Sequence, residues 1–118
     1  MPRKEDVIRL RHMLAAAVDA LSISKGKTRG DLDAEITTRL SLVRCIEIIG
    51  EAAARVSPEG QDEFPKVPWK KIVNMRNRLI HAYHEINLDT VWNTVTDDLP
   101  PLVSGLEEML RDENTNNS

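Results

Sequence analysis

The chain has 118 residues, a length that suits one compact domain and leaves little room for a second. Apolar residues make up 41% of it, which is enough to build a core and excludes a disordered protein. Aromatic residues make up only 3%, so the composition favours helices packed on helices over a sheet sandwich. No apolar run approaches a membrane span and no signal-peptide core follows the first residues. We therefore expect a cytoplasmic protein whose single cysteine, Cys45, is a reduced core residue.

The net charge of −3 is unevenly distributed along the chain. Residues 64–84 hold five basic residues and no acid, whereas residues 85–118 hold eight acids and one arginine. An acidic protein is a poor general binder of nucleic acid. A local basic segment of this kind can still hold a few phosphates.

The first half of the chain predicts two helices. Apolar residues recur at three- and four-residue steps over residues 3–23, as in an amphipathic helix. Residues 24–30 contain two glycines and break this helix. We expect Asp31 or Asp33 to cap a second helix that continues to about Val56.

The second predicted helix is apolar on more than one face. Residues 42–49 contain only two polar side chains, Arg44 and Glu47. Such a helix lies at the centre of a bundle or against a second subunit, and we expect both. Glu47 and Glu51, one turn apart, either face a functional site or bond Arg44 or Arg55.

The second half predicts a loop followed by two more helices. Prolines and a glycine indicate a loop at residues 57–68. A third helix is expected over 69–84, and a fourth begins at Asn87 or Asp89 and must kink or restart at 97–101, where two prolines remove backbone donors. These elements predict an all-α, up-and-down bundle of four to five helices over residues 1–112. A flexible polar tail is expected at 113–118.

One segment of the third helix gathers the groups that RNA cleavage needs without a metal ion: Arg76, Asn77, Arg78, His81 and Tyr83. At 100° per residue, Asn77 and His81 share one face with Arg78 beside them, whereas Arg76 lies about 140° away from His81. One helix cannot easily aim Arg76 and His81 at one small ligand. A groove between two copies can, which favours a two-fold homodimer with a composite cleft.

The matching reaction is cleavage of RNA by its own 2′-hydroxyl. His81 would move the proton, and Arg76 would hold the phosphate oxygens as charge develops. Asn77 would orient the phosphate or fix the imidazole tautomer, and Arg78 with the lysines would hold flanking phosphates. DNA would bind but stay intact, because it lacks the nucleophile. No metal or cofactor is required.

Simpler interpretations stay open for the same residues. An arginine and a histidine on one helix commonly form a solvated surface. His81, His84 and Glu85 also have spacing compatible with a metal site, although no further Cys or His supports it. Tyr83 can be a core aromatic residue with its hydroxyl at the surface, and His12 is expected to be a plain surface residue.

The segment resembles the signature of HepT-type toxins in the HEPN superfamily (higher eukaryotes and prokaryotes nucleotide-binding). That signature is an arginine, four residues, a histidine, one residue and a tyrosine, which Arg76, His81 and Tyr83 match, with the polar Asn77 directly after the arginine. Similar family segments correspond to residues 48–53, 64–69, 91–92 and 98–100. The resemblance covers roughly residues 5–110.

The resemblance implies an all-helical homodimer whose two motifs face an interface cleft. It implies a metal-independent endoribonuclease toxin of a type VII toxin–antitoxin system, with Arg76 and His81 as the catalytic pair and transfer RNA as the expected substrate. It also implies a partner antitoxin, the nucleotidyltransferase MntA, which transfers AMP from ATP to Tyr83. The competing hypothesis is a helical dimer without turnover that binds a nucleotidyltransferase or a nucleotide; the acidic remainder of the chain and the shortage of stacking aromatics motivate it.

Overall fold

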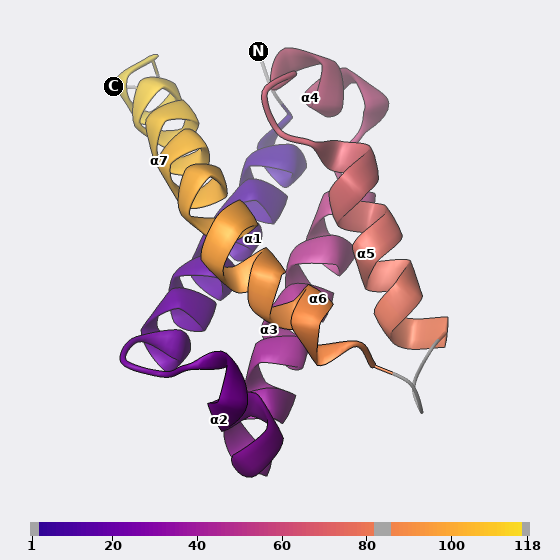
Figure 1. Cartoon of the computed structure of the whole chain (residues 1–118). Helices are drawn as coiled ribbons and strands as arrows, with labels where there is room; N and C mark the ends of the chain where they lie inside the picture. The colour runs from indigo at the N-terminus through magenta and orange to yellow at the C-terminus, as the bar shows by residue number, and fades with distance from the viewer. Residues whose placement is uncertain (1–2, 82–85, 117–118) are drawn as a thin grey trace.

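The computed structural model describes the backbone of residues 3–81 and 86–116, and the side chains of residues 3–79 and 86–111. Every element in these ranges is helical (Figure 1). In chain order they are α1 (Lys4–Ser24), α2 (Arg29–Ala34), α3 (Ile36–Ala54), α4 (Pro58–Glu63), α5 (Trp69–His81), α6 (Leu88–Asn93), the π-helical η1 (Thr94–Asp98) and α7 (Leu99–Asn116). The helices α1, α3, α5 and α7 run alternately up and down, which confirms the predicted all-α bundle.

The helix α3 lies at the centre of the bundle, as its apolar sequence predicts. It packs against α1 on one side and α5 on the other, and α7 covers α1 (Figure 1). Cys45 is buried with a free thiol, and burial raises the pKa of that thiol. The core comprises apolar side chains from all the long helices and from η1, among them Leu10, Met13, Leu42, Ile46, Leu79, Val95 and Leu106.

The predicted second helix is in fact two helices, α2 and α3, and neither Asp31 nor Asp33 caps α3. Asp31 instead belongs to α2, where its carboxylate accepts the backbone N–H of Thr28 at 2.8 Å. The break falls at Glu35, whose backbone is extended and whose carboxylate accepts from Lys27 Nζ at 2.7 Å. The hydrogen bond from Lys27 lowers the pKa of the Glu35 carboxyl. This ion pair links Glu35 to Lys27 in the loop between α1 and α2.

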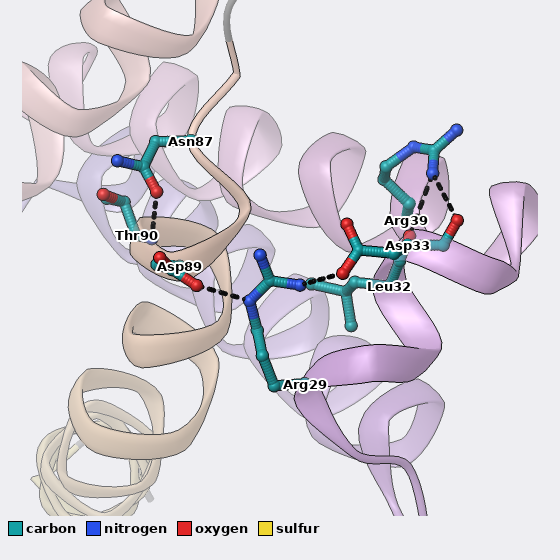
Figure 2. Close-up of polar contacts among 7 residues, drawn as sticks. All are labelled: Arg29, Leu32, Asp33, Arg39, Asn87, Asp89 and Thr90. Carbon is teal, nitrogen blue, oxygen red and sulfur yellow. Dashed lines mark hydrogen bonds and ion pairs between the residues drawn. The ribbon is translucent and has the colours of Figure 1, made fainter.

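Polar contacts join α2 to the start of α6 (Figure 2). The Arg29 guanidinium donates from Nε to Asp89 at 2.6 Å and from Nη1 to Asp33 at 2.9 Å. Asn87 is the N-cap of α6, because its side-chain oxygen accepts the backbone N–H of Thr90 at 3.1 Å. Of the two predicted helix starts, Asn87 is therefore correct, and Asp89 binds Arg29.

The segment predicted as a loop at residues 57–68 contains the short helix α4. Ser57 caps it, accepting the backbone N–H of Gly60 at 3.0 Å. Asp6, buried in the first turn of α1, accepts the Ser57 N–H at 2.9 Å and the Ser57 hydroxyl at 2.6 Å. The hydrogen bonds to Asp6 fix α4 against the start of α1, so prolines and a glycine do not prevent a helix here.

The predicted kink at residues 97–101 takes the form of η1. The N–H of Leu99 donates to the carbonyl of Thr94, five residues earlier, and Pro100 and Pro101 then lie in the first turn of α7, where helices tolerate missing N–H groups. The helix α7 continues through Asn116, so the backbone of residues 113–116 is helical. The flexibility predicted for residues 113–118 remains a prediction.

Candidate functional site

The helix α5 carries the candidate site and ends at His81. The predicted helix over 69–84 is thus confirmed as far as His81. The His81 side chain lies outside the described residues, as do Tyr83, His84 and Glu85. The geometry of the candidate site therefore rests on Arg76, Asn77 and Arg78.

Arg76 packs against the C-terminal half of α3 at Gly50. A Cβ built on Gly50 would meet the Arg76 Cβ at overlapping distance and the Arg76 Cγ at 2.6 Å. Only a residue without a side chain fits at this point of α3. The close approach of the two helices therefore fixes the position of the Arg76 Cβ and Cγ against Gly50; this contact is the Arg76 seat. The arginine is half-buried and is not a solvated surface group.

The Arg76 guanidinium binds the neighbouring carboxamide. Its Nη1 donates to the Asn77 Oδ1 at 2.8 Å. The Nε is buried and has no hydrogen-bond partner among the described residues. Asn77 thus orients Arg76, a contact that helical spacing did not predict because adjacent residues point in different directions. The roles predicted for Asn77 toward phosphate or imidazole remain predictions.

Arg78 faces a different part of the molecule from Arg76. It is exposed and lines a groove of about 500 Å³ between α5 and the α6–η1 segment, together with Lys70, Lys71 and Asn74. The separation agrees with two residues being about 200° apart around a helix. The basic residues of α5 are therefore divided between two of its faces.

The carboxylates Glu47 and Glu51 both bond Arg44, at 3.2 and 3.5 Å, which is one of the two alternatives left open by their spacing. His12 is exposed, as predicted. No cluster of three or more metal-ligating side chains occurs within residues 3–79 and 86–111. The alternative metal site at His81, His84 and Glu85 lies outside the described side chains. Within the described ranges, no helix is both long and apolar enough to span a bilayer.

Comparison with known proteins places the chain in a family. The model of the family described as "Ribonuclease HepT-like" matches residues 13–109, a range that contains the whole Arg76–Tyr83 segment. The chain therefore belongs to the HepT-like ribonuclease family. It shares the all-helical fold that this resemblance implied.

Curated relatives from bacteria and archaea agree with the family assignment. A candidate RNase of Caldanaerobacter subterraneus subsp. tengcongensis, TTE0752, is 34% identical over 104 residues, which cover 88% of this chain and 93% of the relative. A protein of Thermococcus cleftensis named "Probable ribonuclease HepT" is 35% identical over 72 residues, covering 61% of this chain and 66% of the relative. A candidate RNase of Methanocaldococcus jannaschii, MJ0127, is 29% identical over 112 residues, covering 95% and 93%. No solved structure matches the chain.

Proposed function

We propose that the protein is a metal-independent endoribonuclease whose catalytic residues are Arg76 and His81. The observation that carries this proposal is the family match across residues 13–109, combined with the Arg-x4-His-x-Tyr spacing at the end of α5. The relatives named as RNases support the same activity. The substrate is RNA, with transfer RNA the expected target.

The chemistry follows from the two side chains. His81 removes the proton of a ribose 2′-hydroxyl, and the 2′-oxygen attacks the adjacent phosphorus. The bond from phosphorus to the 5′-oxygen breaks, and that oxygen takes up a proton as it leaves. The products are a 2′,3′-cyclic phosphate and a 5′-hydroxyl end. Arg76 stabilises the extra negative charge on the phosphate oxygens in the transition state.

Two features of Arg76 support this role. Its orientation by Asn77 and its seat at Gly50 fix a guanidinium in advance of substrate binding, as electrostatic catalysis requires. The Arg76 Nε is buried without a hydrogen-bond partner among the described residues, and leaving such an N–H unpaired costs about 1–3 kcal/mol. A catalytic role for the guanidinium is one explanation for that cost.

We infer that the active form is a homodimer with a composite cleft. The apolar side chains of Ile36 and Leu40 on α3 are 60% and 56% exposed, and Val18 on α1 is 44% exposed. Exposed apolar side chains on a central helix favour burial against a second copy. Arg76 and His81 are separated by about 140° on one helix, but in a dimer the arginine of one copy could face the histidine of the other.

The biological role that we propose is the toxin of a type VII toxin–antitoxin pair. An MntA-type nucleotidyltransferase would transfer AMP to Tyr83, placing a bulky anion beside the phosphate site and blocking RNA by occupancy and repulsion. Co-expression with such a partner should add the mass of AMP to a peptide that contains Tyr83, and Tyr83→Phe should abolish the addition. Modification confined to another residue removes Tyr83 from this role.

The ribonuclease activity is tested by comparing the wild type with Arg76→Ala and His81→Ala, each expressed without a partner. We expect RNA cleavage in the presence of EDTA by the wild type and a loss of at least 100-fold in each variant, within the range that removal of an acid–base or charge-stabilising group produces. His12→Ala, at an exposed position on α1, is the matched control and should cleave normally. Equal cleavage by His81→Ala would reject the assignment.

A further inference from the structure

The groove between α5 and the α6–η1 segment is open and lined with basic side chains, as a binding site for a nucleic-acid backbone would be. Its volume is about 500 Å³. The side chains that matter are Lys70, Lys71, Asn74 and Arg78 from α5, with Asn93 and Asp98 from the opposite wall. All of these except Asp98 are exposed, so the groove opens to solvent along its length.

Three of the groove residues on α5 form a regular polar stripe. Lys70, Asn74 and Arg78 follow one another at four-residue steps, so they lie along one face of the helix. Lys70 and Arg78 are separated by about 12 Å along the axis at about 1.5 Å per residue. Successive phosphates of a nucleic-acid strand lie at least about 3.4 Å apart, so a stripe of this length can contact more than one phosphate. The helix position of His81 comes at the next three-residue step of the same stripe.

The charges in the groove are available to a ligand. Neither Lys70 nor Arg78 forms an ion pair with another residue that the structure describes. Lys71, in contrast, binds Asp98 across the groove at 3.1 Å. Two free cations and one cation neutralised by a carboxylate favour a ligand with several spaced negative charges over a single ion.

The chemistry of the lining selects the part of the nucleic acid that is recognised. No aromatic side chain lines the groove within the described residues, so base stacking contributes little. Lysine and arginine contact phosphates, and the carboxamides of Asn74 and Asn93 can both donate to phosphate or ribose oxygens and accept from the 2′-hydroxyl. Binding here is therefore salt-dependent and tolerant of sequence.

We propose that this groove is a second substrate site, distinct from the Arg76 seat, that holds the backbone of single-stranded RNA on one side of the cleaved linkage. The inference rests on the proposed ribonuclease function. Arg76 faces α3, whereas the groove faces α6 and η1. The helix position of His81 continues the Lys70–Arg78 stripe, so the strand would run from that position along the stripe.

The test uses a fluorescent 12-nucleotide RNA and its DNA counterpart, with binding measured by anisotropy on the His81→Ala full chain so that the RNA stays intact. The groove variant is Lys70→Glu/Arg78→Glu. The matched control is Lys4→Glu/Lys25→Glu, which changes the net charge equally at exposed residues at the two ends of α1. We expect the groove variant to bind both probes at least tenfold more weakly than the control does. Its slope of log affinity against log salt should fall by about 1.4, from about 0.7 per lost phosphate contact.

A second variant tests the groove by a gain of affinity that misfolding cannot mimic. Asp98→Asn removes the carboxylate that pairs with Lys71, so Lys71 becomes available to phosphate. We expect this variant to bind the RNA probe several-fold more tightly. The proposal is overturned if Asp98→Asn binds the RNA probe no more tightly than the parent protein and the groove variant binds it as well as the control variant does.

Cleavage assays separate the groove from the proposed activity. In a protein with His81 present, the groove variant should show a fall of at least tenfold in the ratio of kcat/KM for the 12-nucleotide RNA over that for a dinucleotide. A wild type that cleaves RNA, with groove and control variants alike in this ratio, overturns the groove alone. A wild type that binds through the groove without cleaving supports the groove and rejects the nuclease. Binding of a polyglutamate peptide in place of either oligonucleotide assigns the groove to an acidic protein and overturns our proposal.

Discussion

At the scale of single residues, the position of Arg76 depends on Gly50, which lies 26 positions earlier in the chain. The glycine is in the interior of α3, where it costs about 0.5–1 kcal/mol relative to alanine. It is retained at a point where α5 approaches so closely that the first carbons of the Arg76 side chain occupy the space of a methyl group. The catalytic role proposed for Arg76 would explain why a glycine occupies this position despite its cost in helix stability.

Gly50→Ala should reverse the usual effect of alanine in a helix. The new Cβ overlaps Arg76 close to its backbone, so α5 must move away from α3 and the guanidinium must shift. Overpacking of this kind typically costs about 1–3 kcal/mol, which exceeds the gain in helix propensity of up to about 1 kcal/mol. We expect a net loss in the free energy of unfolding, measured by urea denaturation, together with slower RNA cleavage.

Gly105 provides the control for the Gly50 substitution. It also lies within a helix, but a Cβ added there would meet only the Met109 Cε at 3.9 Å, an ordinary contact. Gly105→Ala should therefore raise the free energy of unfolding by up to about 1 kcal/mol and leave cleavage unchanged. If both alanine variants gain stability, the seat of Arg76 is not as tight as its geometry indicates.

At the scale of elements, the sequence predicted the long helices well and the short ones poorly. The helices α1 and α5 have a 3.6-residue apolar period over several turns, and α3 contains a long apolar run, so local sequence patterns can detect all three. The helix α4 has six residues, too few for a period, and its cap depends on Asp6, 51 positions away. No local pattern could predict a contact at that separation.

The same limit applies to the candidate site. The residue types and spacing of Arg76, His81 and Tyr83 are visible in the sequence, and so is their resemblance to a family motif. The Gly50 seat and the hydrogen bond from Arg76 to Asn77 are not visible, because one depends on how two helices pack and the other on a rotamer choice. Sequence reasoning thus identified the candidate groups, and packing supplied the orientation of those whose side chains are described.

The link between α2 and α6 shows that contacts between residues far apart in the chain, which local sequence cannot predict, help to position an element. Arg29 bonds Asp89 60 positions later in the chain. The ion pairs are exposed to solvent and screened by salt, so they contribute more to orientation than to stability. Their effect is to hold the start of α6, one wall of the proposed RNA groove, against α2 (Figure 2).

At the scale of the whole molecule, the arrangement on α5 argues for a site shared by two chains. Arg76 faces α3 within its own subunit, and the helix position of His81 is about 140° away around the α5 axis. The apolar side chains left exposed on α3 and α1 are suited to a symmetric contact. In such a dimer, we expect each catalytic site to take the arginine of one subunit and the histidine of the other.

Co-expression of Arg76→Ala with His81→Ala tests this sharing directly. Each variant alone lacks one group in both clefts and should be inactive. A mixed dimer contains one cleft that lacks both groups and one cleft that retains both. With random pairing, half of the dimers are mixed and one of their two clefts works, so we expect about a quarter of the wild-type RNA cleavage rate.

The measurement requires that mixed dimers form, which differently tagged chains and tandem purification establish. Purified mixed dimers should then cleave at about half the wild-type rate per dimer. If they are inactive although both chains are present, then each cleft draws Arg76 and His81 from one chain or needs all four side chains at once. Both explanations are compatible with the family assignment. Both reject the arrangement in which the Arg76 guanidinium of one subunit acts with the His81 imidazole of the other.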